Sequence, residues 1–540
     1  MLANSGIPIH PAVPGIMAKV ISAPAIQLPI IMTNDALEAY DSLMARSKDI
    51  FVLGSSISIL HWDMETKMPP RGLGMRAEQL SALELLIHKK ITDPEIARLL
   101  EVCEREAGAF DPIKARNLSL LRKSYNESAR LPDALVAETA RHQTICNGSW
   151  KKAKAAKDFK MFSDDLAKMI ELRKQAAAIL MEVKGSKTPY DALLDQFEPN
   201  MTAERIDAVF RELRDGLIKL IDKVQSSPTK PDLSLLGRNI PVDVQRKIST
   251  EAMSFIGYDT VSPEAGGRLD ETEHPFTTGS YDDVRITTHY YEDRFFSSLF
   301  SVMHEGGHAL YDQGIPREWM YQPIGTPCSY GIHESQSRFV ENVVGRSPEF
   351  LNYALPRFRK LYPKGFKGMK NKEIIAAANA VNPSKIRVEA DEVTYALHVI
   401  VRFEIEKDIF AGKVTVDELP QLWNQKYSDY LGVRIENDAE GVLQDTHWSG
   451  GAFGYFPSYA LGNIYSGMFL DKMQKDLPQW RKGVRNGDFA PVLQWLRSNV
   501  HSKGDLYDPA DLIRVVTGKE ITVTPFLRYL ERKMSKIYGF

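Results

Sequence analysis

His304, Glu305 and His308 form the pattern H-E-x-x-H, in which the types and the spacing of the side chains suit a metal ion. Two histidines four positions apart lie on one face of a helix, about one turn from each other, so both imidazoles can reach a single Zn²⁺. The glutamate beside the first histidine then points towards the open side of the metal, where water can bind. The pattern predicts a zinc site that needs one further protein ligand.

Glu334 is the candidate for that third ligand. A Gly- and Pro-rich stretch from 310 to 331 predicts a loop, after which Glu334 is expected to open a second helix. Arg338 follows one turn later, where it can brace the carboxylate. Glu341 or Asp312 could orient an imidazole. The structural alternative for Glu334 is a charge favoured by the dipole at a helix N-terminus.

The segment 294–314 that carries the two histidines is predicted to be a helix, because its apolar residues recur at helical spacing and Gly314 can end it. Gly306 and Gly307 lie inside it and cost about 1 kcal/mol each relative to alanine. A helix that accepts this cost is expected to be approached closely by another group at that point.

The pattern of the remaining sequence predicts a mainly α fold, with a small β-sheet beside the metal and a deep cleft. Asn34 is expected to cap the first helix, and alternation predicts a strand at 284–291, taken as an edge strand. Apolar residues three to four apart predict further helices. These lie at 73–106, 112–129, 132–155, 158–184, 203–225 and 526–537.

The composition is that of a large globular protein without a strong charge bias. The 540 residues are 43% hydrophobic, enough for a sizeable core, and carry a net charge of −2. Such a balance argues against nucleic acid or a membrane surface as the main partner. Cys103, Cys146 and Cys328 are odd in number and far apart, which favours reduced thiols in the cytoplasm and no disulfide framework.

Residues 1–31 differ from the rest, with five prolines and no acidic residue. They are predicted to form a disordered extension. No basic region precedes a compact apolar run, so a secretory signal is not expected, and Pro24 and Pro29 interrupt the apolar stretch that could otherwise span a membrane. Organelle targeting by this extension stays open. Residues 32–540 are expected to form one domain, because motifs spread along the chain must converge on one metal.

Six short motifs occur in the order found in one known family. They are His274-Pro275-Phe276, Asp283-Val-Arg285-Ile-Thr287, the H-E-x-x-H, His333-Glu334-Ser335-Gln336, Ile386-Arg387-Val-Glu-Ala390-Asp391 and Gly441-Val-Leu-Gln444-Asp445-Thr-His447-Trp448. From about residue 37 to its end the chain resembles the M32 metallocarboxypeptidases, the thermostable carboxypeptidase Taq type. The resemblance implies a helical zinc-peptidase fold, a homodimer, and one Zn²⁺ per subunit with Co²⁺ as a substitute.

It also implies a reaction, the release of C-terminal amino acids from peptides. Glu305 would take a proton from the metal-activated water and pass it to the leaving nitrogen. The oxyanion would be stabilised by His447, followed by Tyr455 and Tyr459 without a choice between them. The predicted strand could hold a peptide by main-chain pairing.

A carboxypeptidase must also bind the free carboxylate of its substrate, for which the planar fork of arginine is suited. Arg387 is the first choice, and Arg285, fixed by Asp283, is the second. His274 is expected to line the cleft. Two alternatives remain: an oligopeptidase or dipeptidyl carboxypeptidase with the same zinc chemistry, and a catalytically dead helical binding protein, against which the intact Glu305 argues.

Overall fold

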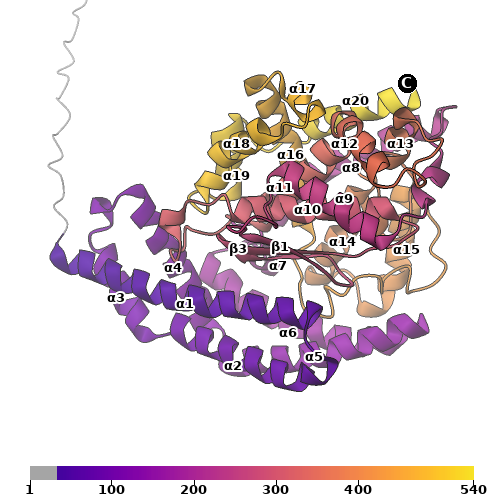
Figure 1. Ribbon diagram of the computed structural model, residues 1–540. Helices are drawn as coiled ribbons and strands as arrows, with labels where there is room; N and C mark the ends of the chain where they lie inside the picture. Colours follow the sequence, from indigo (N-terminus) through magenta and orange to yellow (C-terminus); the bar gives the residue numbers. More distant parts are fainter. Residues whose placement is uncertain (1–32) are drawn as a thin grey trace, which may run out of the picture.

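The computed structural model describes residues 33–540 as a mainly helical body with one small sheet (Figure 1). The predicted fold class is therefore confirmed. The disordered extension expected over residues 1–31 lies outside the described residues. Within 33–540, no helix combines the length and the apolar character needed to cross a bilayer.

The N-terminal third consists of long helices that run beside the rest of the body (Figure 1). These are α1 (Asn34–Thr66), α2 (Leu73–Ile91), α3 (Pro94–Glu104), α4 (Pro112–Arg130), α5 (Asp133–Ala156) and α6 (Lys160–Lys184). Helices α1, α3 and α4 enclose a small hydrophobic cluster of their own, built around residues such as Leu43 and Leu100.

Two details of this region differ from the sequence-based predictions. The first helix is capped by Thr33 rather than Asn34, since the Thr33 side chain accepts a hydrogen bond from the amide of Ala36. The single helix predicted at 73–106 is two helices, because Asp93 caps a new helix whose first residue is Pro94. Proline at that position starts a helix readily but cannot continue one.

The larger part of the chain packs around a second, extensive core. Its helices are α7 (Pro189–Leu194), α8 (Ala203–Ser226), α9 (Val242–Ile256), α10 (Phe295–Asp312), α11 (Tyr330–Arg338), α12 (Pro348–Leu361), α13 (Asn371–Ala378), α14 (Tyr395–Phe410), α15 (Leu419–Leu431), α16 (Pro457–Asp476), α17 (Trp480–Arg485), α18 (Ala490–Asn499), α19 (Pro509–Thr517) and α20 (Thr524–Tyr538). Helix α11 continues into a π-helical turn, η5 (Phe339–Gly345). The mostly buried helix α16 packs against α11, α14 and α20.

The sheet has three strands, β1 (Gly267–Glu271), β2 (Thr277–Ser280) and β3 (Asp283–Thr288), in the order β1-β3-β2. Strand β3 is parallel to β1 and antiparallel to β2, and it packs against α10. The strand predicted at 284–291 is therefore real, but the prediction that it lies at an edge was wrong. Both of its sides are already paired, so it cannot take a peptide as a further strand.

Candidate metal centre and active site

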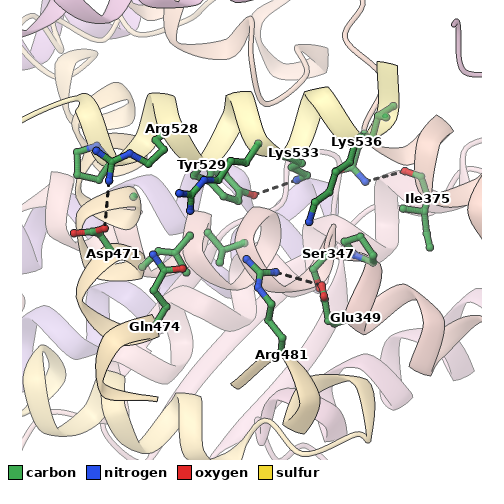
Figure 2. A pocket seen from close by; sticks show the side chains of 18 residues that line it. Ser347, Glu349, Ile375, Asp471, Gln474, Arg481, Arg528, Tyr529, Lys533 and Lys536 are labelled. Carbon is green, nitrogen blue, oxygen red and sulfur yellow. Dashed lines mark hydrogen bonds and ion pairs between the residues drawn. The ribbon is translucent and has the colours of Figure 1, made fainter. Parts of the chain in front are cut away.

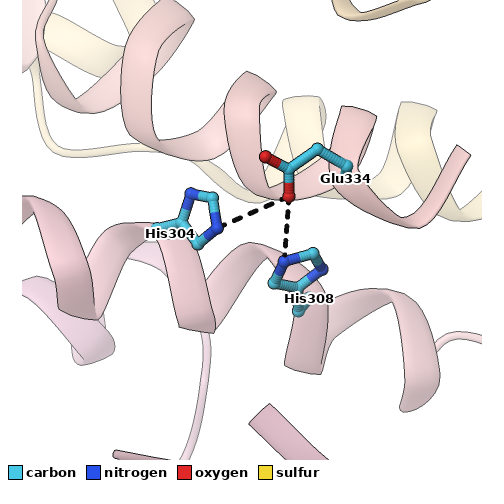
Figure 3. A group of neighbouring side chains, drawn as sticks. All are labelled: His304, His308 and Glu334. Atoms are coloured by element: carbon cyan, nitrogen blue, oxygen red, sulfur yellow. Dashed lines mark ion pairs between the residues drawn. The ribbon is translucent and has the colours of Figure 1, made fainter. Parts of the chain in front are cut away.

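The two histidines of α10 and the glutamate of α11 converge on one point (Figure 3). The Oε2 atom of Glu334 lies 3.5 Å from His304 Nε2 and 3.3 Å from His308 Nε2. The ligand atoms of these three residues all lie within 4.8 Å of one another. Two imidazole nitrogens and a carboxylate oxygen at such spacing fit the donor set of a zinc ion.

Glycines allow the helices to come this close. A Cβ atom on Gly307 of α10 would lie 2.6 Å from the carbonyl oxygen of Gln336 in α11, and one on Gly462 of α16 would lie 2.5 Å from Cγ of Glu334. A Cβ on Gly306 would collide with Ile256. The close approach predicted for the two glycines of α10 is thus observed.

Glu334 does not open its helix, contrary to the prediction. Helix α11 begins at Tyr330 with Ser329 as its cap, so Glu334 lies in its middle. The side chain is buried, and its residue is only 5% exposed. A surface charge placed at the helix end to satisfy the dipole is therefore excluded.

The residue predicted to brace Glu334 and the residue predicted to orient an imidazole are both in place. Arg338 donates through Nε to Glu334 Oε1 over 2.6 Å, and His304 donates through Nδ1 to Glu341 Oε2 over 2.9 Å. The carboxylate that orients the imidazole projects from η5, the π-helical turn, and a further cation, Arg346, binds its other oxygen. Turns of this kind occur often at functional sites.

For Glu334 and His308 the surroundings favour the protonation states that bind metal, whereas for His304 burial is outweighed by Glu334 and Glu341, which raise its pKa. Burial disfavours charge on Glu334, but Arg338 and the imidazoles outweigh it and hold the pKa of this carboxyl well below its usual range. Burial, with His333 nearby, lowers the pKa of His308 to about 3, so this imidazole is neutral at neutral pH. Metal ligands must be neutral imidazoles and ionised carboxylates.

Asp312, the alternative candidate for orienting a metal-binding imidazole, is hydrogen-bonded to His333 instead. Its carboxylate accepts from Nε2 of His333 over 3.2 Å, and the ring of His333 stacks on that of His308 with centroids 4.4 Å apart. Asp312 therefore acts on the histidine ligand only through the stacked ring.

Glu305 is buried beside the triad and held by strand β2. The hydroxyl of Thr277 donates to Glu305 Oε2 over 2.7 Å, and its oxygen also lies 3.0 Å from the carbonyl oxygen of Glu305. Burial raises the pKa of the carboxyl. Sequence reasoning missed Thr277, which follows the His274-Pro-Phe motif directly, and that adjacency was the available signal.

His447, Tyr455 and Tyr459 lie together before and within the first turn of α16. Nε2 of His447 lies 3.3 Å from the hydroxyl of Tyr459, and its ring stacks on that of Tyr455 with centroids 5.4 Å apart. Burial lowers the pKa of His447 to about 4, so its ring is neutral at neutral pH. All three groups can therefore donate a hydrogen bond to an oxyanion.

A buried glutamate of α14 anchors the segment that carries these side chains. Glu406 accepts hydrogen bonds from the indole of Trp448, the amide of Gly454 and the hydroxyl of Tyr190, each over 2.8 Å. Burial raises the pKa of this carboxyl to about 7. The indole of Trp448 therefore serves as a structural contact beside His447.

Arg387 belongs to a buried cluster that holds more positive than negative charges. It donates from Nε and Nη2 to Asp445 Oδ1 over 3.1 and 2.8 Å, and Arg402 donates to Asp445 Oδ2 over 2.6 Å. One carboxylate thus serves two guanidinium groups, which leaves one positive charge uncompensated within the cluster. A buried charge in this state favours an anionic partner.

Tyr395 links this cluster to the metal triad. Its hydroxyl accepts from Nη1 of Arg387 over 3.0 Å, and its ring lies 4.1 Å from the guanidinium of Arg338. Because Arg338 braces Glu334, a short series of contacts joins the metal ligand to Arg387. Sequence reasoning did not single out Tyr395, which falls outside the quoted motifs.

Arg285 and Asp283 pair as predicted, in a neutral arrangement. Nε and Nη2 of the arginine donate to the two carboxylate oxygens over 2.7 and 2.8 Å, and the guanidinium lies 4.3 Å from the ring of Trp62. His274 is exposed between β1 and β2, and within residues 33–540 it makes no hydrogen bond or ion pair. The structure thus joins Asp283 to Arg285 but does not join His274 to the metal triad.

The fold and the site together define a helical metallopeptidase of the H-E-x-x-H type. The family model described as Carboxypeptidase Taq (M32) metallopeptidase matches residues 42–534. Thermostable carboxypeptidase 1 of Thermus thermophilus is 40% identical over 517 residues, which are 94% of this chain and 100% of the relative. Carboxypeptidase 1 of Bacillus subtilis is 39% identical, over 91% and 97% of the two chains.

Solved structures agree with these relatives. The crystal structure of the M32 carboxypeptidase from Deinococcus radiodurans R1 matches with a TM-score of 0.88 and 34% identity, over 93% of this chain and 100% of that one. Metallocarboxypeptidase 1 of Trypanosoma cruzi matches with a TM-score of 0.88 and 32% identity, over 92% and 99%. The chain belongs to the M32 family of metallocarboxypeptidases. It is a peptide hydrolase that acts as an exopeptidase.

Proposed function

We propose that this protein releases C-terminal amino acids from peptides with one Zn²⁺ per subunit, held by His304, His308 and Glu334, and with Glu305 as the general base. The convergence of these three ligand atoms within 4.8 Å, beside a buried glutamate, is the observation that carries the proposal. When bound, Zn²⁺ would supply polarisation of the scissile carbonyl and acidification of water. Co²⁺ is expected to substitute.

Glu305 would remove the proton of the attacking water and return it to the leaving nitrogen. Burial raises the pKa of Glu305, which makes its carboxylate a stronger base than an exposed one. The hydrogen bond from Thr277 to Oε2 fixes the carboxylate in one orientation. A fixed base loses little entropy when the reaction begins.

The oxyanion would be stabilised by the neutral ring of His447 together with Tyr455 or Tyr459. The two tyrosine rings meet edge to face with centroids 5.1 Å apart, so both hydroxyls are candidates on present geometry. Separate substitutions of Tyr455 and Tyr459 by phenylalanine distinguish them. Only the substitution that removes the hydrogen-bond donor to the oxyanion should lower kcat by about 100-fold or more.

Arg387 would bind the free carboxylate of the substrate, since its cluster carries the uncompensated positive charge. Three of its five N–H groups are engaged by Asp445 and Tyr395, which leaves one on each terminal nitrogen. Arg285 remains the second candidate, and its charge is already matched by Asp283. His274 is retained as a candidate contact of the substrate on its exposed loop.

The direct test combines metal removal with a substitution at the base. A chelator should abolish hydrolysis, and Zn²⁺ or Co²⁺ should restore it. Glu305→Gln should keep the bound zinc and lose turnover, whereas Glu251→Gln, on the exposed surface of α9, should change neither. Near-normal kcat in Glu305→Gln, or full activity in metal-free protein, would refute the mechanism.

We further propose that residues 32–540 act as a single domain and that the enzyme is a cytoplasmic homodimer. The buried, free state of all three cysteines supports a reducing compartment. Light scattering should give about twice the chain mass of 60.9 kDa. A mass equal to that of one chain at micromolar concentration would contradict the dimer.

A further inference from the structure

A second concave site lies away from the metal triad, between α20, α16 and the beginning of α12 (Figure 2). It encloses a cavity of about 290 Å³, lined by residues from these helices and from η5, α13 and α17. None of the predicted catalytic or substrate-binding residues lines it. Its size falls near the lower end of the range for small-molecule sites.

Basic side chains dominate this cavity. Arg528, Arg532, Lys533 and Lys536 reach it from α20, where their spacing places them on one face of the helix. Arg481 reaches it from α17, opposite the side chains of α20 (Figure 2). Against these five cations stand only two carboxylates.

Each of the two carboxylates is shared between one cation of the cavity and further cations outside it. Glu349 lies 3.4 Å from Arg481 and 3.7 Å from Arg485, and Asp471 lies 3.0 Å from Lys475, 3.1 Å from Lys519 and 3.9 Å from Arg528. Arg485, Lys475 and Lys519 do not line the cavity, so the two carboxylates are also engaged from outside it. The basic side chains within the cavity therefore carry charge that its own carboxylates do not offset.

Two of these cations are without a partner. Lys533 is committed to Glu392 over 2.6 Å and to the carbonyl oxygen of Asn342 over 3.3 Å. Arg532 and Lys536, by contrast, form no ion pair with any part of the chain from 33 to 540. Like charges one turn apart repel each other, and a shared anion would remove that cost.

The rest of the wall combines apolar residues with the polar side chains of Ser347, Asn379 and Gln474. Leu470 of α16, Pro525 and Ile537 of α20, and Val343 of η5 contribute to it. A cavity that combines two cations without an ion-pair partner with apolar wall residues suits a ligand with a charged head and an apolar body.

We propose that this cavity binds an organic phosphate monoester, with the phosphate on Arg532 and Lys536 and the organic group against Leu470 and Pro525. A phosphate monoester carries about two negative charges near neutral pH, which match the two unpaired cations. Arginine pairs with phosphate through its planar fork and lysine as a point charge. A carboxylate carries one charge and would leave one cation unmatched.

The test is calorimetric titration of the zinc-loaded, full-length protein with four probes. Phenyl phosphate should bind. Inorganic phosphate, benzoate and phenol should bind more weakly, because the first lacks the apolar group, the second carries only one negative charge and the third lacks the phosphate. Arg532→Gln/Lys536→Gln should weaken phenyl phosphate about ten-fold or more, since each lost contact is a hydrogen bond between charged groups. Binding should also weaken at raised ionic strength.

Controls separate this site from general charge effects and from the metal centre. Arg357→Gln/Lys360→Gln removes the same charge from exposed positions of α12 outside the cavity and should leave the affinity unchanged. Arg387→Ala should also bind phenyl phosphate normally. Unchanged affinity in Arg532→Gln/Lys536→Gln would overturn the proposal, as would loss of binding in Arg387→Ala or equal affinity for phenol.

Discussion

Removing Arg387 should damage recognition of the substrate far more than it damages the fold. In Arg387→Ala, Asp445 keeps Arg402 at 2.6 Å, so no buried carboxylate is stranded. The hydroxyl of Tyr395 loses one donor, which costs about 1–3 kcal/mol at most. Asp445→Asn, in contrast, would leave two buried guanidinium groups without their carboxylate and should destabilise the protein by about 3–5 kcal/mol.

The effect on catalysis follows from the carboxylate of the substrate, which would lose its charged partner in Arg387→Ala. Truncating one partner of a buried, hydrogen-bonded charge pair costs about 2–5 kcal/mol, which is roughly 30-fold to several-thousand-fold in kcat/KM. Arg387→Lys should restore only part of this, because a point charge cannot replace the planar fork.

The assay compares matched peptides with a free and an amidated C-terminus, together with the unfolding free energy of each variant. Arg387→Ala should lose hydrolysis of the free acid and leave any residual cleavage of the amide unchanged. An enzyme that cleaves both peptides equally well before substitution would be an endopeptidase. If Arg285→Ala removes the free-acid preference while Arg387→Ala keeps it, the two roles are reversed, and if neither removes it, the argument from uncompensated charge fails.

Three further predictions follow from the contacts around the site. Glu341→Gln should weaken zinc binding about 10- to 100-fold, because the carboxylate that orients His304 is lost, and metal-buffer titration with unchanged affinity would contradict this role. Glu406 has a folded-state pKa raised from 4.5 to about 7, so its contribution to stability is fully present below pH 4.5 and lost as pH rises through 7. The stability advantage of the wild type over Glu406→Gln in urea unfolding should therefore shrink by about 2.5 kcal/mol between about pH 5 and 8, and a growing advantage would refute the assignment. A chain that begins at Met32 keeps the Thr33 cap of α1 and should retain zinc and kcat/KM, whereas a large loss of either would tie the extension to the active site.

The local part of this site was readable from the sequence. The spacing of His304 and His308 fixes their common face, and Arg338 and Glu341 follow Glu334 at distances that helical geometry brings into reach. Because such relations depend on one helical segment at a time, they survive errors in element boundaries, such as the placement of Glu334 at the start rather than the middle of α11.

Contacts between distant segments were decided only by the tertiary structure. Strand β2 covers one side of β3 and brings Thr277 to Glu305, and neither the pairing order of the strands nor this hydrogen bond has a local signal. Tyr395 meets both Arg338 and Arg387 only because helices far apart in the chain pack together. The sequence determined which residues can bind a metal and carry charge, whereas packing decided which of those charges remain without a partner, because compensation depends on which distant side chains are brought close.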